Sequence, residues 1–163
     1  MTQGRASAYI ALGANLDRPR RQVETALKEL GRLPDSRLTR VSGLYLSRAM
    51  GHPDQPDYIN AVARLRTALE PCALLDALLA IEHRHGRERT FKNAPRTLDL
   101  DILLSDDRVL DHPGLHLPHP RMHERAFVLA PLAEIAPDCV IPGHGPVREL
   151  LDGLQVGSVQ RLR

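Results

Sequence analysis

Residues 97–104 read TLDLDILL, which places two aspartates in a row of leucines. Leucine or isoleucine alternates with polar or acidic residues, a pattern typical of a β-strand with one buried face. A strand would separate the even-numbered Leu98, Leu100, Ile102 and Leu104, for which we expect burial, from the odd-numbered Thr97, Asp99, Asp101 and Leu103. Asp99 and Asp101 would then lie on one face, about 7 Å apart along the strand.

The segments around this strand predict an alternating order of strands and helices. Further strands are expected at 8–12, 37–47 and 57–68, and helices begin at Pro19 and Pro71, the second ending near Gly86. Prolines interrupt residues 112–137, where we expect short helices at most until about residue 122, and PVRELLDGL (146–154) predicts a short terminal helix. This order predicts an α+β, ferredoxin-like split βαβ fold: a largely antiparallel sheet with helices on one face and a C-terminal elaboration.

Length, composition and charge limit which partners the protein is expected to bind and where in the cell it is expected to act. The chain has 163 residues, which predicts a single domain (1–163). Its net charge of +2 is too small to indicate a nucleic-acid partner, and we expect none. No apolar run has the length of a membrane span, and no secretory signal precedes the first strand. Cys72 and Cys139 belong to no metal-spaced cluster. These features predict a cytoplasmic protein that binds small molecules rather than membranes. We also expect a monomer, although nothing in the composition bears on the oligomeric state.

The paired aspartates follow a strongly basic segment. Residues 84–96 read RHGRERTFKNAPR, with five arginines and lysines against one acid, and Arg96 precedes Asp99 by three positions. Neighbouring carboxylates repel unless a cation lies between them, and Mg²⁺ is often held by one or two carboxylates together with phosphate oxygens. A Mg-nucleotide site is one interpretation, and a solvated outer strand face is the other. The pattern alone favours neither, and no P-loop sequence is present.

A second polar pair lies in DQPDYINA, where Tyr58 and Asn60 share one face of an expected strand. An aromatic ring beside an amide is suited to stack on a flat heterocycle and hydrogen-bond its edge. The alternative is an edge strand whose Tyr and Asn face water.

Five segments, taken in order, resemble a known family: YIALGANL, DQPDYINAV, IEHRHGRER, APRTLDLDILL and LPHPRMHERAFVLAPLAEIAP. Together they are similar to 6-hydroxymethyl-7,8-dihydropterin pyrophosphokinases (HPPK) of folate biosynthesis, from about Tyr9 to Leu151. The resemblance implies an ATP-dependent enzyme that transfers pyrophosphate to the hydroxymethyl group of the pterin, giving AMP and the pterin pyrophosphate.

The resemblance also implies a role for individual residues. Two Mg²⁺ ions would be held by Asp99 and Asp101. Arg87 and Arg96 would clamp the phosphates and carry catalysis. ATP would be bound by Glu82, Arg87, Arg89, Arg96, His119 and Arg125, and the pterin by Gly51, Tyr58, Asn60 and Phe127.

One departure from the family lies before Gly51, where Arg48-Ala49-Met50 replaces the proline pair and leucine that many members carry. Two other function classes remain open at this point. One is a non-catalytic domain that keeps a nucleotide site, against which the complete set of Asp99, Asp101, Arg87 and Arg96 argues. The other is a metal-dependent phosphohydrolase, which could also use two Mg²⁺-binding carboxylates.

Overall fold

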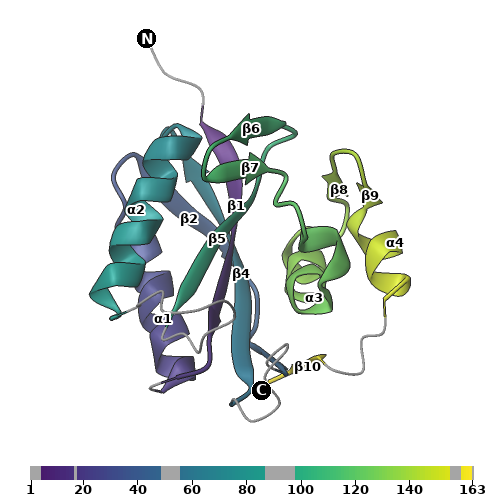
Figure 1. Cartoon of the computed structure of the whole chain (residues 1–163), viewed down its shortest axis with the longest axis horizontal. Helices are drawn as coiled ribbons and strands as arrows, with labels where there is room; N and C mark the ends of the chain where they lie inside the picture. Colours follow the sequence, from purple (N-terminus) through teal and green to yellow (C-terminus); the bar gives the residue numbers. More distant parts are fainter. Residues whose placement is uncertain (1–4, 17, 49–55, 87–97, 155–158, 163) are drawn as a thin grey trace.

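The computed structural model describes residues 5–16, 18–48, 56–86, 98–154 and 159–162. The elements follow in this order: β1 (Ala6–Ala14), α1 (Pro19–Leu30), β2 (Ser36–Val41), β3 (Tyr45–Ser47), β4 (Tyr58–Thr67), α2 (Pro71–Arg84), β5 (Asp99–Ser105), β6 (Leu110–His112), β7 (Leu115–Leu117), a 3₁₀ turn (Met122–Glu124), α3 (Ala126–Ile135), β8 (Val140–Ile141), β9 (Gly145–Pro146), α4 (Val147–Asp152) and β10 (Val159–Arg161). Figure 1 shows a central sheet with helices on either side.

The main sheet has the strand order β10-β3-β4-β1-β5. Strand β2 pairs with the same edge of β4 as β3 does, further along β4. All neighbouring strands of the sheet are antiparallel. The register puts Gly13 of β1 opposite Asn60 of β4 on one side and opposite Asp99 of β5 on the other. Residues directly opposite one another share a face of the sheet, so Asn60 and Asp99 flank a residue that has no side chain.

Helices cover both faces of the sheet: α1 and α2 lie together on one face, as expected, and α3 of the C-terminal elaboration covers the other. Helices α1 and α2 pack on one face through Val23, Ala26, Leu30, Leu74, Leu78 and Ile81. On the other face, α3 packs against Val62, Leu103 and Leu104, and α4 packs on α3 (Figure 1). In the described part of the chain, no helix is both long and apolar enough to cross a membrane.

Two corrections concern strands. The expected strand at 37–47 is two strands, β2 and β3, which pair with different parts of β4. In β5 the register shifts where Tyr9 pairs with Leu104 and Ile10 with Ile102. Leu103 and Leu104 therefore both pack with the α3 cluster, whereas strict alternation assigned Leu104 to the opposite face. The short strands β6 to β10 had no counterpart in the expected order.

Leu78 of α2 is fully buried between the helix layer and the sheet. We expect Leu78→Ala to lower the free energy of unfolding by about 2–5 kcal/mol, because it removes a buried side chain and leaves a cavity. Leu79, the next residue on the same helix, is 40% exposed and provides the matched control. Urea unfolding of both variants measures the difference; equal losses would contradict the assignment of α2 to the core.

Glu134 of α3 links this helix to β3, to β10 and to the segment just before β3, on the side of the sheet opposite to α1 and α2. Its carboxylate accepts hydrogen bonds from the Tyr45 hydroxyl (2.7 Å), the Gly43 N–H (3.0 Å to Oε2) and Arg161 Nε (3.1 Å). Burial would raise the pKa of Glu134, but hydrogen bonds from Arg161, Tyr45 and Gly43 outweigh it and lower the pKa below 4.5. Burial, together with Glu134, raises the pKa of Tyr45 to about 12, so its hydroxyl remains a donor.

The lowered pKa makes a sign-specific prediction about pH. A carboxylate with a depressed folded-state pKa stabilises the fold above its unfolded pKa, and that contribution is lost as pH falls through the folded pKa. We expect Glu134→Gln to be less stable than the wild type at pH 7 and the difference to shrink toward pH 3. Urea unfolding at several pH values measures this, with the exposed Glu149 of α4, changed to Gln, as control. If the loss of unfolding free energy in Glu134→Gln were the same at every pH, this prediction would be wrong.

Candidate active site

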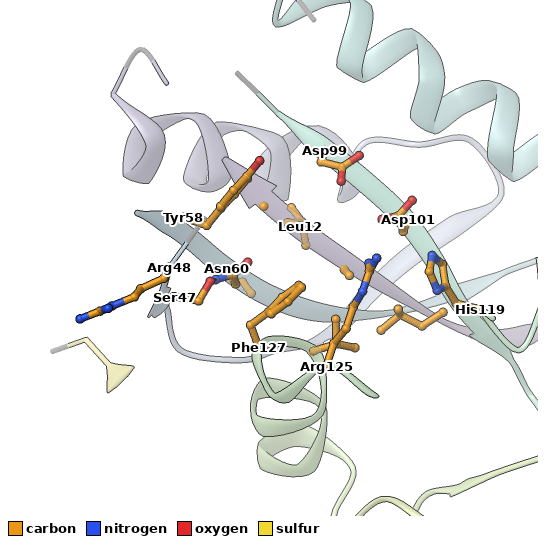
Figure 2. A pocket seen from close by; sticks show the side chains of 15 residues that line it. Leu12, Ser47, Arg48, Tyr58, Asn60, Asp99, Asp101, His119, Arg125 and Phe127 are labelled. Atoms are coloured by element: carbon orange, nitrogen blue, oxygen red, sulfur yellow. The ribbon is translucent and has the colours of Figure 1, made fainter. Parts of the chain in front are cut away.

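A pocket opens on the sheet face that carries α3. It is lined by Ala11, Leu12, Gly13, Ser47, Arg48, Tyr58, Asn60, Ala61, Asp99, Asp101, Leu103, His119, Arg125, Phe127 and Val128. Figure 2 shows Asp99, Asp101, His119 and Arg125 toward one end and Tyr58, Asn60 and Phe127 toward the other. The pocket therefore has a charged part and an aromatic, amide-bearing part.

The aspartates lie in the charged part because β5 alternates there as the sequence predicts. Asp99 and Asp101 are half-buried, whereas Leu98, Leu100 and Ile102 face the α1 and α2 layer. Their partners on β1 are Gly13 and Ala11, whose small size leaves space beside the carboxylates. The buried Glu82 of α2 accepts a hydrogen bond from the Leu100 N–H (2.8 Å), which holds the backbone between the two aspartates.

His119 supplies a neutral donor next to this acidic pair. Burial first, and then the nearby Arg125 guanidinium, lower the pKa of His119 to about 4, although Asp99 opposes them. The Arg121 backbone N–H donates to His119 Nδ1 (3.2 Å), so the proton of the neutral ring resides on Nε2. Arg125 immediately precedes α3, and its guanidinium carbon lies 5.7 Å from the centroid of the Phe127 ring. Arg125 thereby connects the charged and aromatic parts.

Asn60 has a defined amide orientation. It is 5% exposed, and its Nδ2 donates to Ser47 Oγ (2.7 Å) and, at 3.4 Å, to the Tyr45 carbonyl. Both N–H groups are thus directed at β3. The oxygen Oδ1 is turned toward Gly13, where an added Cβ would lie only 3.4 Å from it. Within the pocket, Asn60 therefore presents an acceptor rather than a donor.

The structure brings most of the expected residues together: Asp99, Asp101, His119, Arg125, Tyr58, Asn60 and Phe127 line one pocket. Glu82 is not part of the lining and reaches the site through Leu100. Arg87, Arg89, Arg96 and Gly51 lie outside the described residues.

Gly13 and Ser47 also line the pocket, and neither was predicted from the sequence. A glycine inside a strand signals a close approach of other groups, so Gly13 carried a usable signal. Ser47 carried none, since its role depends on its pairing with β4.

Comparisons with known proteins identify the family of the chain. The sequence model of 7,8-dihydro-6-hydroxymethylpterin-pyrophosphokinase (HPPK) matches residues 9–137. The chain is 50% identical over 154 residues to a 2-amino-4-hydroxy-6-hydroxymethyldihydropteridine pyrophosphokinase of Pseudomonas aeruginosa, covering 94% of this chain and 95% of the relative. The protein of the same name from Haemophilus influenzae is 46% identical over 145 residues, covering 89% and 91%.

Among solved structures, an HPPK-DHPS of Plasmodium falciparum with pteroate superposes with a TM-score of 0.74 at 12% identity, covering 98% of this chain. The chain spans 47% of the length of that protein, and the likeness concerns the fold alone. The family match extends over most of the chain, and the curated relatives share up to half of its residues. The chain belongs to the 7,8-dihydro-6-hydroxymethylpterin-pyrophosphokinase family.

Proposed function

We propose that this pocket is where the chain carries out the reaction of its family. The chain is an ATP-dependent pyrophosphokinase of folate biosynthesis. It transfers pyrophosphate from ATP to the hydroxymethyl group of 6-hydroxymethyl-7,8-dihydropterin and releases AMP. The observation that carries the assignment to this pocket is the single row across β4, β1 and β5, in which Asn60 and Asp99 flank Gly13. In that row, an amide suited to a heterocycle lies near a carboxylate suited to a metal ion, which supports the proposal.

Asp99 and Asp101 are suited to hold Mg²⁺, and we propose two ions. Both side chains are half-buried in an open pocket, and no third His, Cys, Asp or Glu joins them in a metal-binding group within the described ranges. This donor set fits Mg²⁺, which takes one or two carboxylates and completes its shell with phosphate oxygens and water. When bound, Mg²⁺ would neutralise charge on the triphosphate. The carboxylates hold the metal, and the Leu100 N–H bond to Glu82 keeps their strand in place.

His119 and Arg125 lie where they can bind the transferred phosphates. Neutral His119 donates from Nε2, and Arg125 adds a positive charge at the same end of the pocket. Positioning and charge neutralisation dominate phosphoryl-type transfer, so donors of this kind contribute to the rate. From the family resemblance we add Arg87 and Arg96 as catalytic phosphate clamps, Arg89 as a further ATP contact and Glu82 as a residue that acts on the ATP side through β5.

The pterin would occupy the aromatic part of the pocket. Tyr58 and Phe127 come from β4 and from the first turn of α3, and both line the cavity in which Asn60 lies. A flat heteroaromatic ring between them would be held by stacking. Asn60 Oδ1 is suited to accept a hydrogen bond from an N–H on the edge of that ring. Gly51 is assigned to the pterin side on the resemblance alone.

Several coarser features accompany this function. The order β2/β3-β4-β1-β5, with α1 and α2 on one face, supports a ferredoxin-like core to which α3, α4 and β10 are added. We propose that residues 1–163 form one pyrophosphokinase domain. We also propose that it acts as a cytoplasmic monomer on small molecules, without nucleic acid or membrane partners.

Product analysis tests this function. Purified protein is incubated with ATP, Mg²⁺ and hydroxymethyldihydropterin, and the nucleotides and pterins are separated. We expect equal amounts of AMP and pterin pyrophosphate. ADP or free phosphate would instead indicate a phosphohydrolase or another kinase, and tight nucleotide binding without turnover would indicate a non-catalytic domain.

A further inference from the structure

The C-terminal strand β10 forms the outer neighbour of β3. Val159 pairs with Ser47 and Arg161 with Tyr45, and the Leu162 N–H donates to the Leu44 carbonyl (2.7 Å). In Figure 1, β10 lies near the lower end of β4. The three-residue strand β3 is therefore held on one edge by β4 and on the other by the last residues of the chain.

Arg161 fastens this strand to α3 as well as to β3. Its Nε donates to Glu134 Oε1 (3.1 Å), the carboxylate that also accepts from Tyr45 and Gly43. The guanidinium lies directly against Gly43, where an added Cβ would approach its nitrogen Nη2 to 2.7 Å. Only a residue without a side chain at position 43 allows this contact. The Arg161 side chain is 57% exposed, so solvent weakens its ion pair with Glu134. The ion pair therefore matters less for overall stability than for the position in which it holds β3.

Strand β3 orients the side-chain amide of Asn60, and this orientation depends on the position of the strand. Ser47 Oγ and the Tyr45 carbonyl both accept hydrogen bonds from Asn60 Nδ2. Those two bonds turn Oδ1 into the pocket. A small displacement of β3 would release the amide, which could then rotate and present its NH₂ group where an acceptor is needed. The geometry of β3 thus sets the hydrogen-bonding character of Asn60.

We propose that Arg161 is a positioning residue for pterin recognition: through Glu134 and Tyr45 it holds β3, and β3 fixes the acceptor orientation of the Asn60 amide. The residue touches neither substrate. This inference rests on the proposed assignment of Asn60 to the pterin. It predicts a selective effect, because the aspartates on β5 and the donor His119 lie toward the other end of the pocket.

Calorimetry of pterin binding with Arg161→Ala tests it. We expect the Kd for hydroxymethyldihydropterin, measured with a non-hydrolysable ATP analogue and Mg²⁺ present, to rise about three- to tenfold, the scale of one lost hydrogen bond. The Kd for the ATP analogue should change by less than a factor of about two, and so should kcat at saturating pterin. Arg148→Ala, which removes an exposed arginine of α4, is the charge-matched control.

Gly43→Ala provides a second route to the same displacement. The added methyl group would push the guanidinium from Glu134 while leaving Arg161 in the chain. If both changes act through one contact, the Gly43→Ala/Arg161→Ala double variant should bind pterin no more weakly than Arg161→Ala alone. The side-chain NH₂ resonances of Asn60 should shift in both single variants and not in Arg148→Ala.

Three outcomes are decisive against the proposal. Unchanged pterin affinity in Arg161→Ala would overturn it, as would an equal loss of pterin and nucleotide affinity together with a lowered Tm, since that would indicate general destabilisation. Failure of the wild type to bind pterin at all would instead overturn the proposed function, and this inference with it. Comparing wild type and variants in one assay separates the two cases.

Discussion

Asp99→Asn and Asp101→Asn are each expected to lower kcat by about 100-fold or more in Mg²⁺. Metal coordination by a carboxylate supplies several kcal/mol of charge stabilisation in the transition state, and each 1.4 kcal/mol or so corresponds to tenfold in rate. Asparagine keeps the side-chain volume but removes the charge that holds the ion. Both aspartates are half-buried at the edge of an open pocket, so the fold should persist. Steady-state AMP release and thermal unfolding measure the two effects.

The control for this pair lies on the same strand–turn segment. Asp107 follows β5, is exposed and lies outside the pocket, so Asp107→Asn changes the net charge equally but leaves the site intact. Binding of Mn²⁺ in the presence of an ATP analogue adds a readout that does not depend on turnover. Near wild-type rates in either site variant, or Mn²⁺ affinity equal to that of Asp107→Asn, would show that the metal is held elsewhere.

The acidic pair was predictable because its placement is local. The period of two in residues 97–104 puts Asp99 and Asp101 on one face of any strand, and both line the pocket. The same rule was wrong for Leu104, because the register shift opposite Tyr9 and Ile10 adds a residue to β5. Such an irregularity depends on the partner strand and has no signature in the bulged segment itself.

The sequence of β4 contained evidence that a second helix layer, formed by α3, covers the other face of the sheet. Val62 lies on the face of β4 opposite to Ala61 and Ala63, yet all three are fully or almost fully buried. A strand that is apolar on both faces requires cover on both, which α3 provides. The direction in which α3 packs was not predictable from its own sequence, since the helix is apolar on most sides and contains Pro131.

Ser47 and Arg161 were beyond sequence reasoning for a different reason. Their roles come from contacts between residues far apart in the chain: Ser47 with Asn60, and Arg161 with Glu134 and Gly43. Neither contact follows from local periodicity. The family resemblance could transfer Asn60 as a position, whereas the orientation of its amide required the pairing of β3 with β4.

That orientation leads to the second large effect, which concerns Asn60 itself. Asn60→Ala is expected to weaken pterin binding by about 1–3 kcal/mol, roughly five- to 150-fold, because the ligand's polar edge would be buried without its partner. The loss should exceed what a missing methylene could cause, since a site built to hydrogen-bond its ligand discriminates strongly when one partner is absent. ATP-analogue binding serves as the internal control, because Asn60 lies in the aromatic part of the pocket.

Ser47→Ala separates the orientation of the amide from its presence. It retains Asn60 but removes the acceptor at 2.7 Å that holds Nδ2, leaving only the longer contact to the Tyr45 carbonyl. We expect a loss of pterin affinity that is smaller than in Asn60→Ala, with no further loss when the two changes are combined. Calorimetric titration of the three variants with pterin and with the ATP analogue measures this. Equal weakening of both ligands in Asn60→Ala would remove Asn60 from the pterin site, and additive losses in the double variant would show that Ser47 acts on the ligand by a route other than the Asn60 amide.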